Sequence, residues 1–142
     1  MTQAWHALAR NLYQDYEAIA AEARHSAVLH ADETGWRLNG ITHWLWCFTT
    51  RTMCCYVITK SRGSPVVKQV LGLLFQGILV CDFWGAYNKI DTLATQRCFY
   101  HLFTELVKVD KRNRSQAWKA FRKKLSRLLK DAIRLSQNSE LR

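Results

Sequence analysis

The sequence predicts an α/β fold, with a mixed five-stranded sheet of three antiparallel strands and two parallel additions, flanked by helices. Residues 43–50 and 53–60 are rich in aromatic and β-branched side chains and are separated by only two residues, as in a β-hairpin. Together with residues 28–38 they form a predicted antiparallel meander. The apolar run at residues 78–81 has the composition of a buried parallel strand. Helical patterns on both sides of this run indicate helix crossovers, which favour parallel, right-handed connections.

The chain is expected to begin with a helix over residues 3–25, followed by a first strand over residues 28–32. Apolar side chains recur at three- and four-residue steps along the helix. The strand is apolar up to Ala31, and we expect it to run out at Asp32 and Glu33. Thr34 and Gly35 would then turn the chain.

A second helix is expected after the meander, over residues 64–76. Ser64 is the predicted N-cap and Pro65 occupies the first helical position. Gly77 is expected to end this helix, just before the strand at residues 78–81.

The last predicted elements are a short helix through Leu93, a strand over residues 96–100 and a long helix from His101 to about Ser136, broken near Asn113. One face of the long helix is apolar and the opposite face is basic.

Positive charge is concentrated at the end of the chain. Residues 108–142 carry 12 Lys and Arg against 3 acids, which is +9 of the net charge of +10. We therefore expect a core over residues 1–107 and a basic amphipathic helical extension over residues 108–142 that meets a polyanion. A solvated helix face would carry the same charge. The candidate DNA-contacting residues are Lys119, Arg122, Lys123, Arg127, Lys130 and Arg134.

The cysteines and the hydropathy of the chain indicate a cytosolic protein. Five cysteines lie in or near apolar strand-like runs with no signal-like segment before them, so we expect reduced core thiols. Cys98 and His101 have the spacing of half a zinc site, but no second pair completes it. No apolar run reaches the roughly 20 residues of a membrane span, so no membrane partner is expected.

Asp32 and Asp82 each follow a predicted parallel strand. Ligands of open α/β sheets bind at the carboxyl ends of the strands. Two close carboxylates repel each other unless a cation lies between them, and Mg²⁺ prefers one or two carboxylates together with substrate phosphates. A pair of such ions serves phosphodiester chemistry, and a third acid normally completes the site. Alternatively, the residues after Ala31 form only a polar turn.

The sequence resembles IS66-type insertion-sequence transposases in several spaced blocks. The run His30–Trp46, which includes Asp32, resembles the first catalytic motif of that family. The run Ser61–Tyr87, which includes Asp82, resembles the second, and Gln96–Leu102 resembles the strand with Cys and His that follows. The similarity covers roughly residues 5–110.

This resemblance implies a ribonuclease-H-like fold and a DDE-type site that cuts and joins DNA with Mg²⁺ at element ends. By this resemblance Asp32 would be the first and Asp82 the second of the three catalytic acids. Glu33 matches the motif as a structural neighbour, and His101 matches without a clear role. The implied partners are DNA and a full-length transposase or a second copy of the chain.

The sequence departs from the family pattern at the third acid. The family carries it in an Asn-Asn-x-x-Glu-Arg pattern, which is absent here. Glu105 and Glu140 are possible substitutes, but neither has the matching context. We therefore expect the front part of a catalytic domain, from a truncated element, with little or no transposition by itself. Two alternatives stay open: a non-catalytic DNA-binding or subunit-interaction fragment, and a small self-contained ribonuclease-H-like nuclease.

Overall fold

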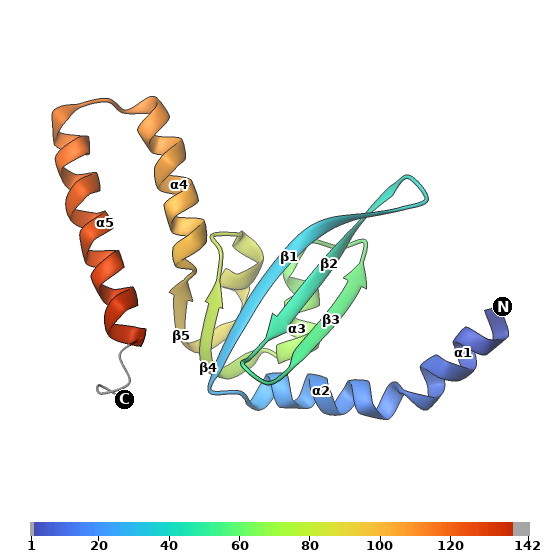
Figure 1. The fold of residues 1–142 in the computed structure, drawn as a ribbon. Coiled ribbons are helices and arrows are strands. Elements are labelled where there is room, and N and C mark those ends of the chain that lie inside the picture. The colour runs from blue at the N-terminus through green and yellow to red at the C-terminus, as the bar shows by residue number, and fades with distance from the viewer. Residues whose placement is uncertain (1, 138–142) are drawn as a thin grey trace. The chain divides into compact units, whose positions relative to one another are not determined.

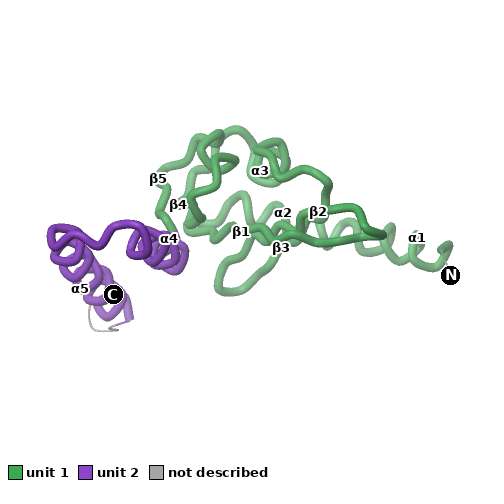
Figure 2. Tube along the Cα trace, turned by 90° about the horizontal axis from the view of Figure 1, so that it is seen from above, with its two compact units in different colours: residues 1–97 green, residues 98–142 purple. Residues whose placement is uncertain are grey.

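The structure, a computed structural model, describes residues 2–137 and divides the chain into two compact units. Residues 1–97 contain the sheet, and residues 98–142 contain two long helices (Figure 2). The α/β class and the mixed five-stranded sheet are confirmed for the described residues. The predicted functional boundary after residue 107 stays a prediction.

The predicted N-terminal helix is present as two consecutive helices, α1 (Thr2–Asn11) and α2 (Tyr13–His25). Helical hydrogen bonds continue through Leu12, whose N–H donates to the Leu8 carbonyl, so the interruption is confined to one residue. No residue of α1 is buried, whereas α2 buries Ala20 and Ala23. Only α2 therefore contributes to the core.

The prediction that the first strand ends at Asp32 is wrong. β1 runs from Val28 to Leu38 and pairs with antiparallel β2 (Ile41–Thr49) along a ladder that reaches the turn at Asn39 and Gly40. In this ladder Thr34 pairs with Leu45 and Gly35 with Trp44, and this pairing outweighs their local preference for a turn. β3 (Cys54–Thr59) completes the predicted meander.

The second helix is shorter than predicted. α3 (Ser64–Leu71) ends at Gly72, which has a positive φ of 82°, and β4 already begins at Leu74 and runs to Cys81. Gly77 therefore lies inside a strand. The apolar residues after Gly72 match a helical stripe in sequence, but the ladder between β4 and β5 recruits them to the sheet.

The segment after Asp82 also differs from the prediction. A short 3₁₀ helix, η1 (Gly85–Lys89), stands where a helix through Leu93 was expected, and β5 (Asp91–Arg97) follows at once. The predicted strand at residues 96–100 is thus displaced toward the N-terminus. Parallel pairing of β5 with β4 decides this assignment.

The sheet has the strand order β3-β2-β1-β4-β5, in which β1, β4 and β5 are parallel neighbours (Figure 1). α2 and α3 contribute to a core with the strand residues of one face. Along β1, Leu29 and Ala31 are buried, whereas Val28, His30 and Asp32 are exposed. The alternation of side chains along β1 therefore separates a covered face from an exposed face.

The described residues of the second unit, 98–137, form a helical hairpin of α4 (Phe99–Arg112) and α5 (Gln116–Gln137). The predicted break near Asn113 is confirmed, although the first helix begins two residues before His101. Leu106 and Leu129 are buried, and Asp110 accepts hydrogen bonds from Trp118 Nε1 (2.7 Å) and Arg122 Nε (3.3 Å).

All five cysteines are free thiols. Cys55 and Cys81 are buried core residues as predicted, whereas Cys47, Cys54 and Cys98 are half-buried. None of the described helices combines the length and the apolar content that crossing a membrane requires.

Candidate functional site

Asp32 and Asp82 follow the parallel ladder of β1 and β4 at matching positions. The ladder between β1 and β4 ends where His30 pairs with Val80, and each aspartate lies two residues beyond this last pair. Neighbouring strands are about 4.8 Å apart, so both acids start from adjacent backbone positions. The sequence left open whether these two strands are adjacent, and the structure makes them neighbours.

Backbone N–H groups orient both carboxylates. Oδ1 of Asp32 accepts a hydrogen bond from the N–H of Glu33 at 2.9 Å. Oδ1 of Asp82 accepts one from the N–H of Trp84 at 2.8 Å, which closes a tight turn after β4. The backbone carbonyl of Asp82 also accepts a hydrogen bond from Arg97 of β5.

Glu33 points away from Asp32, to the covered face of the sheet, because successive side chains of a strand alternate. Its side chain is 0% exposed and lies 3.0 Å from Arg62, from Oε1 to Nε. Oε2 accepts a hydrogen bond from the hydroxyl of Tyr87 in η1. Burial raises the pKa of the Glu33 carboxyl, while the hydrogen bonds from Tyr87 and Arg62 act in the opposite direction.

Tyr87 is buried and is a hydrogen-bond donor in this site. Burial raises the pKa of its hydroxyl well above 10, and the hydrogen bond to Glu33 raises it further. The charges of Asp82 and Asp32 act in the same direction on this pKa. Tyr87 therefore keeps its proton at neutral pH.

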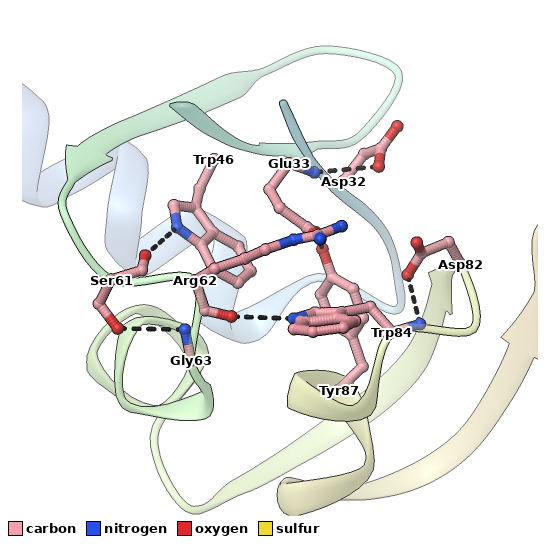
Figure 3. Close-up of polar contacts among 9 residues, drawn as sticks. All are labelled: Asp32, Glu33, Trp46, Ser61, Arg62, Gly63, Asp82, Trp84 and Tyr87. Carbon is pink, nitrogen blue, oxygen red and sulfur yellow. Dashed lines mark hydrogen bonds and ion pairs between the residues drawn. The ribbon is translucent and has the colours of Figure 1, made fainter. Parts of the chain in front are cut away.

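Arg62 lies at the centre of the contacts shown in Figure 3. Its guanidinium carbon is 4.3 Å from the ring centroid of Trp44 and 4.1 Å from that of Trp84. The Arg62 carbonyl accepts a hydrogen bond from Trp84 Nε1 at 2.9 Å. Sequence reasoning assigned no role to Arg62 or to the two tryptophans. The available signal was the position of Ser-Arg-Gly within the second motif block.

The donor chemistry of Asp32 and Asp82 fits Mg²⁺, which binds hard oxygen ligands and usually takes one or two carboxylates from the protein. Within residues 2–137 no group of three or more His, Cys, Asp or Glu side chains is placed to hold a metal ion. Glu105 is exposed and pairs with Lys108 in α4, and Glu140 lies outside the described residues. The structure therefore brings together two acids, without assigning a third.

The basic residues predicted to contact DNA lie on α5. Four of them (Lys123, Arg127, Lys130 and Arg134) line a surface groove of about 340 Å³ together with Ser126 and Asp131. Lys119 is exposed. Arg127 and Arg134 both form ion pairs with Asp131, at 3.9 and 3.5 Å. Arg122 pairs with Asp110 of α4, so its charge is also compensated within the hairpin.

A family model described as "Transposase IS66 family" matches residues 1–142. Comparison with curated proteins gave no match, and neither did comparison with solved structures.

Proposed function

This chain belongs to the IS66 family of transposases, and we propose that it forms the part of a ribonuclease-H-like catalytic domain that supplies the first two metal-binding acids, Asp32 and Asp82. The reaction is cleavage and strand transfer of DNA at the ends of an insertion sequence. One observation carries this proposal: the two aspartates continue the register of adjacent parallel strands. Ligand sites of open α/β sheets lie at that edge.

In this proposal Asp32 and Asp82 would hold Mg²⁺, which supplies an activated oxygen nucleophile and stabilises the leaving oxygen. The chain's own residues orient these ligands. Backbone N–H groups fix one oxygen of each carboxylate, and Arg97 holds the carbonyl of Asp82. Tyr87 keeps its proton and holds Glu33 on the covered face, away from the two aspartates.

We further propose that residues 1–142 by themselves transpose DNA weakly or not at all, because the Asn-Asn-x-x-Glu-Arg pattern of the third acid is not among them. The chain would act in the cytoplasm on DNA, together with a full-length transposase or a second copy. If the chain is instead a self-contained nuclease, Glu105 or Glu140 completes the site.

The test is calorimetric titration of the full chain with Mn²⁺, which replaces Mg²⁺ at oxygen sites. We expect Asp32→Asn and Asp82→Asn each to lower the association constant roughly tenfold or more, since each removes one of two anionic ligands. Asp15→Asn, at an exposed aspartate of α2, is the matched control and should bind as the unaltered chain does. Equal binding by all four proteins would contradict the site. Metal-dependent DNA nicking that survives Asp32→Asn would exclude both catalytic alternatives.

The groove on α5 supports a second proposed activity, sequence-independent DNA binding through phosphates. The test variant replaces four groove residues by alanine: Lys123, Arg127, Lys130 and Arg134. The matched control removes the same charge from residues 1–97, at Arg10, Arg51, Lys60 and Lys89. Each lost phosphate contact should reduce the slope of log K against log salt by about 0.9 on duplex DNA. Equal slopes for the two variants would refute a specific role of α5.

A further inference from the structure

Arg62 is connected to both proposed metal ligands through one intermediate residue each. On one side it pairs with Glu33, which directly follows Asp32 in β1. On the other side the Arg62 carbonyl accepts a hydrogen bond from the indole Nε1–H of Trp84, and the backbone N–H of Trp84 donates to the carboxylate of Asp82. No direct bond from Arg62 to either aspartate is needed for this connection.

The loop that carries Arg62 is itself held in place. The indole N–H of the buried Trp46 donates to the Ser61 carbonyl at 3.1 Å, and the Gly63 N–H donates to Ser61 Oγ at 3.1 Å. A side chain at Gly63 would come within 3.1 Å of Pro65 Cδ. The sheet and the start of α3 thus fix the point from which the Arg62 side chain extends.

The segment from Asp82 to Tyr87 depends on side-chain hydrogen bonds for its position relative to β1, because backbone pairing between β1 and β4 has already ended. The last pair of that ladder joins His30 to Val80. Beyond it, side-chain bonds hold this segment to the rest of the sheet: Trp84 is bonded to Arg62, and Tyr87 to Glu33 (Figure 3). These bonds span the gap between the two chain segments that carry the aspartates.

The chemistry of this contact is specific for arginine. A guanidinium is planar, so it can lie against indole rings while its Nε–H donates to a carboxylate. Its distances to the rings of Trp44 and Trp84 and to Glu33 match this arrangement. A lysine would keep the positive charge but would lose the planar contact and its fixed donor direction.

We propose that Arg62 is a positioning residue that sets the separation of Asp32 and Asp82 for a divalent cation, through Glu33 on one side and Trp84 on the other. This inference rests on the proposed metal site. Arg62 acts on the geometry of the ligand pair, and it does not touch the metal.

The test is Mn²⁺ affinity of the full chain in a double-mutant cycle. Outer partners of metal ligands change affinity by roughly 10- to 100-fold, so we expect Arg62→Lys to weaken Mn²⁺ binding about tenfold. Once Asp32→Asn has already broken the ligand pair, Arg62→Lys should weaken binding no further. Additive losses in the double variant would overturn the positioning role, because they would show an effect independent of the ligand pair.

Two further variants keep the test decisive. Trp84→Phe retains a ring beside Arg62 but removes the indole hydrogen bond, and it should weaken Mn²⁺ binding even if Arg62→Lys fails to fold. Arg37→Lys is the matched control, because Arg37 lies near the β1–β2 turn and bonds only the Gly40 carbonyl there. Normal binding by both Arg62→Lys and Trp84→Phe overturns this inference alone. Binding that is independent of Asp32 and Asp82 overturns the proposed metal site as well.

Discussion

The two units of the chain each contain an arginine–carboxylate pair next to aromatic rings, and the pairs differ in burial. In the sheet unit Glu33 has a side chain that is 0% exposed and pairs with Arg62. In the helical hairpin Asp110 is 39% exposed and pairs with Arg122, whose guanidinium lies 5.8 Å from the ring centroid of Phe103. The two ion pairs therefore have the same chemistry but differ in how far their carboxylates are exposed to water.

Burial decides which of the two pairs the fold depends on. A buried charge that loses its partner keeps its desolvation penalty, whereas an exposed charge regains water. Glu33 also joins three segments, because its partners lie in the loop before α3 and in η1. Asp110 joins only the two helices of one hairpin. We therefore expect substitutions to separate the two units clearly.

The largest effect is expected from Arg62→Ala. It leaves the Glu33 carboxylate buried without its cation, and we expect a loss of about 3 kcal/mol in the free energy of unfolding, measured by urea denaturation. This value lies at the lower end of the range for removing one partner of a buried ion pair, because Tyr87 still donates a hydrogen bond to Glu33. If Arg62→Ala lowered the free energy of unfolding by no more than the loss of the exposed Asp110–Arg122 pair does, the expected difference between the two units would be contradicted.

The cost of Arg62→Ala should depend on pH. The folded pKa of Glu33 is raised above its ordinary 4.5, so its contribution to stability is present below pH 4.5 and is lost as pH rises through the folded pKa. Removing the Arg62 cation raises that pKa further, so the stability difference from the unaltered chain should grow between pH 4.5 and neutrality. When Glu33 is replaced by Gln, the effect of Arg62→Ala on stability should no longer depend on pH over this range. If the pH dependence persists, a group other than Glu33 causes it.

Packing in the sheet unit gives the next largest effect. A Cβ at Gly77 would lie 2.4 Å from the Ser26 carbonyl oxygen and 2.7 Å from Phe75 Cζ. Gly77→Ala should therefore cost about 2 kcal/mol of unfolding free energy. Gly35→Ala is the matched control in β1, where nothing lies within 4 Å, and it should stabilise by about 0.5 kcal/mol. Equal thermal midpoints for the two variants would contradict the close contact.

The smallest effect is expected from Asp110→Asn in the hairpin. The amide oxygen can still accept the hydrogen bond from Trp118, so only the charge pair with Arg122 is lost. We expect a cost of about 0.5 kcal/mol, seen as slightly faster amide hydrogen exchange in α4 and α5. A cost as large as that of Arg62→Ala would show that the hairpin depends on its ion pair as strongly as the sheet does.

Much of the architecture was predictable because its signals are local. Aromatic and β-branched runs identified the meander, and the apolar run that ends at Cys81 identified a buried strand. The alternation of helices and strands then predicted that β1 and β4 are parallel. The structure adds that they are neighbours, which brings Asp32 and Asp82 together.

The errors in the prediction arose where pairing with another strand overrides the local preference of a segment. β1 continues past Asp32 because β2 pairs with it up to Leu38. The helix α3 ends at Gly72 and the following residues join β4, because β5 provides a partner for them. β2 follows β1 directly, across the turn at Asn39 and Gly40, whereas β5 begins only at Asp91. In both cases the deciding partner lies outside the short segment whose composition indicated a turn or a helix.

The sequence by itself determined the order of the elements, the uneven distribution of charge and the two aspartates that follow the parallel strands. Only the tertiary structure decided that Glu33 turns to the covered face and that Arg62 reaches it between Trp44 and Trp84. These contacts join residues from β1, β2, the loop before α3 and the segment after β4. They depend on side-chain directions that exist only once the sheet has formed, so no local pattern could encode them.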